Sequence, residues 1–180
     1  MISHVLSRFS NAWSDFFTGT PTKNENQTYT SRQTPSKSSV YILNCLFNHC
    51  ISTSGNGGAL CCTTVTYLLV ESSSFFSCST NSSYGGAICF DNTDSGECVL
   101  HMVCGNDCFS TYTGGNSFGQ FAYIYVSNDV SSKNYVNYSS IAHCVNEIST
   151  PYVLIRHYNG KICCPSVNLS MNKCYRLSGI

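Results

Sequence analysis

A block of this sequence occurs twice, and the two copies lie 28 residues apart. In each copy a phenylalanine and a cysteine are followed by a pair of glycines and a short apolar run. The matched residues are Phe47 and Phe75, Cys50 and Cys78, Gly57 and Gly85, and Gly58 and Gly86. Repeats of roughly 20 to 50 residues are typical of solenoids, because each unit buries its apolar face only by stacking on a neighbour. The sequence therefore predicts a stacked repeat fold.

The cysteine of the repeated block recurs at similar intervals through the rest of the chain. Intervals of 28, 30, 36 and 30 residues separate Cys50, Cys78, Cys108, Cys144 and Cys174. An apolar residue stands three positions before four of these cysteines, and Gly105 is the exception. Short apolar runs alternate with clusters of Ser, Asn and Gly, which is typical of strands and turns. A β-sandwich also has short, regularly spaced strands, but it does not require a block repeated at a fixed offset.

The chain before residue 40 has a different character. Apolar residues from Ile2 to Phe17 recur at spacings of three and four, which indicates an amphipathic helix that Gly19 and Pro21 end. Residues 18–39 are rich in Thr, Ser, Asn and Gln, so we expect a polar linker there. The uncovered end of a solenoid exposes strand edges that would pair with other chains. We therefore expect residues 1–17 to form a capping helix over the end of the solenoid domain, residues 40–180.

The paired motifs resemble the repeats of the polymorphic membrane proteins of chlamydiae and of their cysteine-rich counterparts in trichomonads. That family pairs Gly-Gly-Ala-Ile with Phe-x-x-Asn, and here Gly57-Gly58-Ala59-Leu60 and Gly85-Gly86-Ala87-Ile88 are paired with Phe-x-x-Cys. The resemblance implies a right-handed parallel β-helix, of the pectin lyase-like type, displayed at the cell surface for adhesion. We accordingly expect an all-β fold of about four to five stacked coils.

Composition argues against two classes of partner. Nine basic and nine acidic residues give a formal net charge of zero, so electrostatic capture of nucleic acid has no support. No apolar run approaches the roughly 18 to 20 residues of a membrane-spanning helix. Polar residues also interrupt every apolar run in the first 20 positions, so no export signal is visible. The resemblance implies a cell-surface or extracellular location, and the missing signal makes the cytoplasm the alternative.

The thirteen cysteines leave three alternatives open. They are buried free thiols, disulfides between neighbouring coils, or ligands of a metal. An odd number leaves at least one thiol without an intrachain partner. His101, Cys104 and Cys108 are candidate metal ligands, but no second matching pair completes a structural zinc pattern. We expect neither a metal nor a cofactor.

Enzymatic activity is the alternative from a different class, because many parallel β-helices are polysaccharide lyases or glycosidases. Such enzymes need converging carboxylates. Asp91, Asp94, Glu97 and Asp107 are the only local concentration, and residues 91–96 first of all indicate a turn. The cysteines and histidines show no recognisable nucleophile signature. We therefore expect no catalytic residues and a structural or interaction module with an adhesin-like role. A truncated or non-functional repeat fragment of a larger surface protein is the third alternative.

Variable loops are the expected binding elements. Their lengths differ while the flanking repeats keep phase, so they should project from the stack. The loops are Ser52–Asn56, Ser79–Tyr84, Ser110–Phe118 and Ser127–Asn134. Tyr84, Tyr112 and Phe118 would give them aromatic contact surface for a host-cell or matrix protein or glycan. We also expect that the C-terminal end, which has no cap in the sequence, can self-associate.

Four asparagines fit the N-glycosylation pattern, which has meaning only in the secretory pathway. They are Asn26, Asn81, Asn137 and Asn168.

Overall fold

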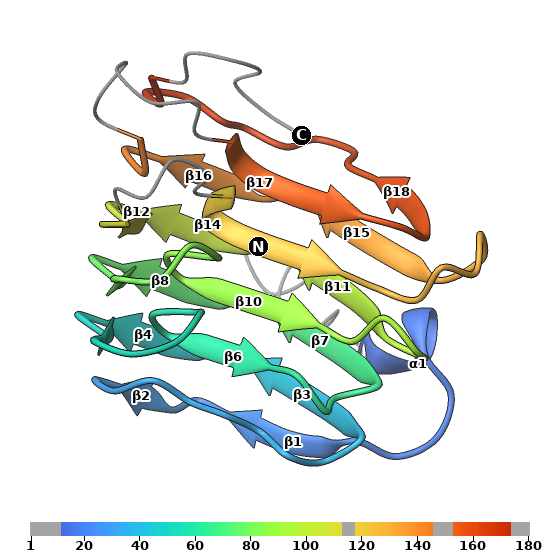
Figure 1. Cartoon of the computed structure of the whole chain (residues 1–180). Coiled ribbons are helices and arrows are strands. Elements are labelled where there is room, and N and C mark those ends of the chain that lie inside the picture. Colours follow the sequence, from blue (N-terminus) through green and yellow to red (C-terminus); the bar gives the residue numbers. More distant parts are fainter. Residues whose placement is uncertain (1–11, 113–117, 146–152, 174–180) are drawn as a thin grey trace, which may run out of the picture.

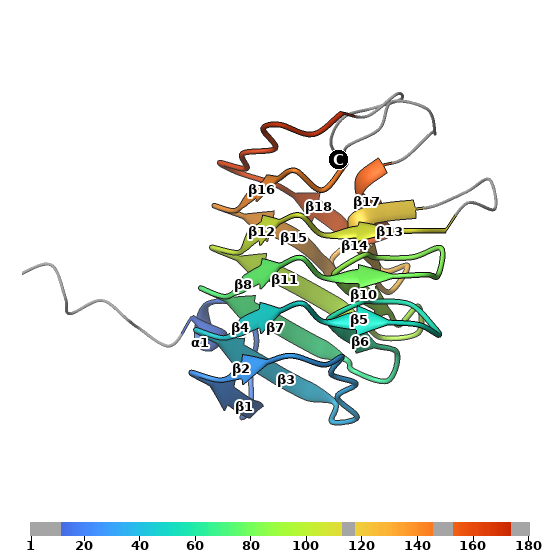
Figure 2. The same ribbon diagram turned by 90° about the vertical axis from the view of Figure 1, so that its left-hand side faces the viewer.

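The computed structural model describes residues 12–112, 118–145 and 153–173. Its strands pair in parallel and stack as a right-handed β-solenoid of about four turns. Figures 1 and 2 show the coils layered from an N-terminal end to a C-terminal end. Phe47 and Phe75 are in-register partners on adjacent parallel strands. The predicted all-β parallel solenoid is thus confirmed, and the β-sandwich alternative is wrong.

Within the described residues, four sheets run along the stack and successive coils supply successive strands. Sheet A contains β1 (Thr22–Glu25), β3 (Ser39–Leu43), β7 (Tyr67–Glu71), β11 (Glu97–His101), β15 (Lys133–Asn137) and β18 (Lys161–Cys163). Sheet B contains β2 (Thr28–Tyr29), β4 (Leu46–Asn48), β8 (Ser74–Phe76), β12 (Cys104–Asn106) and β16 (Ser140–Ala142). Sheet C contains β6 (Leu60–Cys62), β10 (Ile88–Asp91), β14 (Phe118–Tyr125) and β17 (Val153–Tyr158). Sheet D contains β5 (Ile51–Ser52), β9 (Ser79–Thr80) and β13 (Phe109–Ser110).

Two sharp bends in each coil pass through single residues with positive φ. The bend between sheets A and B uses Asn44, Ser72, Met102 and Tyr138, with φ of 51°, 48°, 55° and 51°. The bend after sheet B uses His49, Ser77, Asp107 and His143, with φ of 53°, 50°, 56° and 55°. Because a left-handed residue is costly outside glycine and asparagine, the stacked hydrogen bonds of neighbouring coils must hold these bends in place.

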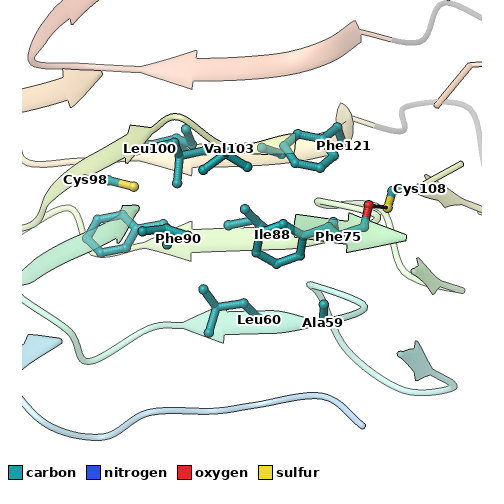
Figure 3. Close-up of a cluster of buried hydrophobic side chains, with 14 of the residues drawn as sticks. Ala59, Leu60, Phe75, Ile88, Phe90, Cys98, Leu100, Val103, Cys108 and Phe121 are labelled. Carbon is teal, nitrogen blue, oxygen red and sulfur yellow. Dashed lines mark hydrogen bonds between the residues drawn. The ribbon is translucent and has the colours of Figure 1, made fainter. Parts of the chain in front are cut away.

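The coils enclose one cluster of buried apolar side chains (Figure 3). Phe47 and Phe75 are fully buried, with ring centroids 4.5 Å apart and planes 2° apart. Tyr29 continues this stack at 4.8 Å from Phe47. Since register places each residue over its equivalent one coil away, identical side chains form ladders through the interior.

Gly105 interrupts the phenylalanine ladder because a different ring takes the space. Gly105 pairs with Phe75, so it occupies the phenylalanine position of its coil. In the same coil Phe121 replaces the small residue found as Ala59 and Ala87 in the coils below. The Phe121 ring meets Phe75 edge-on, at 5.9 Å and 86°, and a Cβ on Gly105 would overlap it. The large and the small side chain have thus exchanged places in this layer.

The first glycine of each repeated pair is required by the backbone. Gly57 and Gly85 have φ of 69° and 66°, and Gly119 takes this position in the next coil with φ of 72°. A Cβ at any of the three would also overlap a carbonyl oxygen three residues ahead. The second glycines, Gly58 and Gly86, lie against the backbone of the neighbouring coil, where a Cβ would overlap main-chain atoms. The repeated glycines therefore allow a left-handed turn and a close approach between coils.

The structure does not show the predicted capping helix. Residues 1–11 lie outside the described part of the chain, and the described helix α1 spans only Trp13–Phe16. It packs against the side of sheet A, where Trp13 meets Tyr41 at 6.0 Å and Phe17 meets Tyr67 at 5.3 Å. These rings cover an apolar outer surface of sheet A. The helix α1 therefore lies against the side of the stack (Figure 1).

The prediction that residues 18–39 form a linker is wrong, because they contain the first coil. β1 pairs with β3 and β2 pairs with β4, both in parallel, and Gln33 forms a bridge with Leu60. Most side chains of β1 are exposed. Backbone hydrogen bonds to a single neighbouring coil hold this segment, so it lacks the apolar pattern that would have indicated strands.

The exchange of a large and a small side chain at Gly105 and Phe121 predicts that two substitutions compensate each other. Gly105→Phe should lower the free energy of unfolding by about 2 to 3 kcal/mol, because two rings then compete for one space. Phe121→Ala alone should lower it by about 3 to 5 kcal/mol through a cavity. The double variant should recover part of both losses, with a coupling of about 2 kcal/mol in urea unfolding. Additive losses would contradict the exchange.

The left-handed bends predict a stabilising substitution. Met102 has φ of 55° and is 52% exposed, so replacing it by asparagine relieves backbone strain and loses little burial. We expect Met102→Asn to raise the free energy of unfolding by about 0.5 to 1 kcal/mol. Val130→Asn is the control, since Val130 is 86% exposed and does not have positive φ. Thermal unfolding should show a gain for the first variant only.

Candidate functional site

Aromatic side chains gather on the outer face of sheet C, which faces the viewer in Figure 1. Along β14, Tyr123 and Tyr125 point outward while Ile124 between them is buried in the core. Their register partners on β17 are Arg156 and Tyr158. Tyr84 and Phe118 form a bridge beside them. We call this surface the tyrosine face: Tyr84, Phe118, Tyr123, Tyr125, Arg156 and Tyr158.

The rings of the tyrosine face form a continuous set of contacts. Tyr84 lies 4.6 Å from Tyr123 and 6.1 Å from Phe118, the latter nearly parallel at 9°. Tyr158 lies 5.8 Å from Tyr123 and 5.0 Å from Tyr125. Tyr123 is buried and the other four rings are partly exposed. The phenol groups therefore sit on a rigid sheet with their rings already packed, which lowers the entropy lost when a partner binds.

Arg156 places one positive charge among these rings. Its guanidinium lies 4.4 Å from the Tyr158 ring and 5.2 Å from the Phe118 ring, and its Nη2 donates to the Tyr158 hydroxyl at 2.8 Å. Among the described residues, its buried Nε has no hydrogen-bond partner. The guanidinium is thus held in place by cation–π contacts and retains an unused donor.

Asp91 and two cysteines complete the lower part of the same face. Cys61 and Cys89 are register partners, and Cys89 pairs in turn with Tyr123. Asp91 pairs with Tyr125. Burial raises the pKa of the Asp91 carboxyl, and burial, followed by the nearby Asp91 charge, raises the pKa of Tyr123. Both shifts favour the neutral forms of Asp91 and Tyr123.

Only part of this face was predicted from the sequence. Tyr84 and Phe118 were expected to give aromatic contact surface, and both lie on the tyrosine face. Tyr112 follows β13 and is half-buried. Tyr123, Tyr125 and Tyr158 were missed. The signal was the alternation Tyr-x-Tyr in one repeat and Arg-x-Tyr at the same phase of the next.

The predicted projecting loops are partly strand. Sheet D includes the starts of the first three, and β15 includes the end of the fourth. The remaining connections hydrogen-bond to one another from coil to coil. Thr80 Oγ1 donates to the Gly55 carbonyl at 2.7 Å, and Ser110 Oγ donates to the Ser82 carbonyl at 2.6 Å. The edge of the stack is therefore an ordered surface where these connections are described.

The predicted acidic residues are not brought to one place. Asp91, Asp94 and Glu97 lie along the connection from β10 of sheet C to β11 of sheet A. Asp107 lies elsewhere, in the bend after sheet B. The predicted turn is confirmed, since Asn92 Oδ1 accepts hydrogen bonds from the Asp94 and Ser95 backbone nitrogens. Glu97 forms an ion pair with Lys133 at 3.0 Å. Asp107 accepts from Ser77 Oγ at 2.9 Å.

The candidate metal ligands are also separated. His101 lies on the outer side of sheet A, between Phe16 at 5.6 Å and Tyr138 at 5.7 Å. Cys108 is fully buried in the core. Within residues 12–112, 118–145 and 153–173, no three His, Cys, Asp or Glu side chains form a group suited to a metal ion.

The repeated cysteines form an internal ladder of free thiols. Cys50, Cys78, Cys108 and Cys144 are all buried, and the twelve described cysteines form no disulfide with one another. The Cys78 thiol donates to the Phe47 carbonyl in the coil below at 3.6 Å. The Cys108 thiol donates in the same way to the Phe75 carbonyl at 3.4 Å (Figure 3). Burial raises the pKa of Cys108, so the thiol stays protonated and can serve as this donor.

The last rung of the ladder is an asparagine. Ser140 pairs with Asn168, which places Asn172 and not Cys174 beside Cys144. Asn172 Oδ1 accepts from the Cys144 backbone nitrogen at 2.8 Å, and its Nδ2 donates to the Ile141 carbonyl at 2.8 Å. The assignment of the fifth repeat position to Cys174, which lies outside the described residues, is therefore wrong. Asparagine and cysteine make equivalent hydrogen bonds at this position. Following the cysteines alone therefore assigned the wrong residue to the fifth repeat.

One of the four candidate glycosylation asparagines is buried. Asn137 is 7% exposed, whereas Asn26, Asn81 and Asn168 are exposed. Only these three have side chains that a modifying enzyme could reach in the folded protein.

Comparison with protein-family models, curated proteins and solved structures gives no match to this chain. Fold and surface define its class: a cysteine-rich right-handed parallel β-solenoid with an aromatic outer face. Among the residues that the structure describes, no helix has the length and apolar character needed to cross a bilayer.

The ladder predicts different outcomes for two substitutions of one cysteine. Cys144 Sγ accepts the Cys108 backbone N–H at 3.3 Å. Cys144→Val leaves this buried donor unpaired and should lower the free energy of unfolding by about 1 to 3 kcal/mol. Cys144→Asn should cost less, because Asn172 already fills the equivalent position in the next coil. Urea unfolding checks the order, and a valine variant as stable as the asparagine variant would contradict the acceptor role.

Proposed function

We propose that this chain is a non-enzymatic binding module of adhesin-like type, in which the solenoid is the scaffold and the tyrosine face is the contact surface. The observation that carries this proposal is the packing of five aromatic rings and Arg156 over adjacent strands of sheet C. The resemblance of the repeats to polymorphic membrane proteins supports a place at the cell surface.

The composition of the face favours a protein partner. Tyrosine and arginine are enriched at protein interfaces and among the residues whose truncation costs most affinity. The described charged groups on the face are Arg156 and Asp91, so long-range steering by charge plays a small part. Arg156 is partly exposed, so its guanidinium can pair with a carbonyl or carboxylate of the partner.

A variant that removes the centre of the face tests this proposal. The purified chain should bind saturably to surfaces coated with host-cell or matrix protein, and the double variant Tyr125→Ala, Arg156→Ala should weaken binding about 10- to 100-fold. Biolayer interferometry against matrix proteins, and against an array of glycans in parallel, provides the measurement. Surface staining of the native cell with an antibody tests the location.

Tyr138→Ala is the matched control, because Tyr138 is 59% exposed and lies in the bend between sheets A and B. It should leave binding unchanged, and both variants should keep the circular dichroism spectrum of the parent. Equal losses in the two variants, or binding confined to glycans, would contradict a protein-binding tyrosine face.

A further inference from the structure

Three polar side chains from the last two described coils form a hydrogen-bonded row that no sequence motif indicated. His157 lies on β17 and pairs with Ile124, a core residue, so its ring points into the coil. Its Nδ1 lies 2.5 Å from Oδ1 of Asn134 on β15, and its Nε2 lies 3.8 Å from Sγ of Cys164, which follows β18. The row therefore joins a thiol, an imidazole and an amide.

Hydrogen bonds of Asn134 fix the direction of the row. Asn134 Nδ2 donates to the carbonyls of Tyr158 and Asn159, both at 3.1 Å, so its Oδ1 is the atom that faces His157. An amide oxygen only accepts, so His157 carries its proton on Nδ1. The lone pair of Nε2 then points at the Cys164 thiol, which assigns the thiol as donor and the imidazole as acceptor.

Burial keeps both members of the thiol–imidazole pair neutral. It lowers the pKa of His157 to about 4 and raises the pKa of Cys164. At pH 7 the imidazole is therefore unprotonated and the thiol still holds its proton. A nucleophile, a base within reach and a third group that orients the base are the parts of an activated nucleophile. Cys164 and His157 are half-buried and Asn134 is fully buried.

We propose that Cys164 is a nucleophilic thiol that accepts one acyl group from an ester or thioester, with His157 as its general base and Asn134 as the positioning residue. The thiol proton passes to His157 Nε2 while sulfur attacks the acyl carbonyl. The tetrahedral intermediate then expels the alcohol or thiol of the donor, which takes the proton from Nε2. The products are an S-acyl Cys164 and the protonated leaving group, and no oxidant or reductant is needed.

The neighbouring Cys163 provides a control within the chain. It precedes Cys164 directly, is also half-buried, and pairs with Tyr135 on sheet A. Side chains alternate along a strand, so the Cys163 thiol points to the opposite face from Cys164 and away from His157. A reagent that tests thiol exposure alone would modify both residues at similar rates.

Acylation by 4-nitrophenyl acetate tests the assignment on the full chain under reducing conditions. We expect one acetyl group per chain by intact mass, located on Cys164 by peptide mapping, with one equivalent of 4-nitrophenolate released. His157→Gln should slow this step roughly 100-fold or more, the scale of general-base catalysis, and Cys163→Ala should leave it unchanged. Circular dichroism confirms that each variant is folded.

Two readouts on the unsubstituted protein separate base catalysis from simple exposure. If His157 removes the proton, the acylation rate is nearly constant from pH 6 to 8, because the imidazole is neutral throughout. The rate also falls in heavy water, because the proton moves during the attack. A rate that rises tenfold per pH unit, or acetylation of Cys163 as fast as of Cys164, would show only ordinary exposed thiols and overturn the proposal.

Discussion

In-register parallel stacking is the constraint on which the rest of this structure depends. Each residue lies over its equivalent in the next coil, so a side chain must fit its own layer and the layers above and below. The parallel rings of Phe47 and Phe75 show the favourable case. Where the ladder changes at Gly105, the Phe121 ring takes the space beside Phe75. The pairing of β14 with β10 keeps its register there, whereas the pairing of β14 with β17 shifts between Phe118 and Ala122.

The same constraint explains what the sequence predicted well. A ladder needs equivalent residues at every turn, so the block around Phe47 and Phe75 revealed both the fold and the spacing between coils. The register partners Val40 and Leu68, Leu68 and Cys98, and Cys98 and Asn134 follow the intervals of 28, 30 and 36 residues. At two places residue type misled, each for its own reason. Asn172 bonds like a cysteine, and β1 is held by backbone bonds that leave no pattern in its side chains.

The candidate site was harder to predict, because a surface carries no requirement for repetition. Tyr84 and Phe118 stood out as aromatics in variable segments, whereas Tyr123 and Tyr158 come from strands whose inward residues dominated the pattern. The row from Asn134 to Cys164 joins residues 30 positions apart through the closure of one coil. No local spacing encodes such a contact, and it becomes visible only when the register of β15, β17 and β18 is known.

The exchange of large and small residues at Gly105 and Phe121 bears on how such a chain can change over evolutionary time. Both members of the exchange belong to one coil, and a residue pair inherited together needs no simultaneous mutation elsewhere in the gene. A coil that carries its own compensation can be copied, deleted or moved as a unit, and the neighbouring coils still meet a filled layer. The gene can thus lengthen or shorten by whole turns.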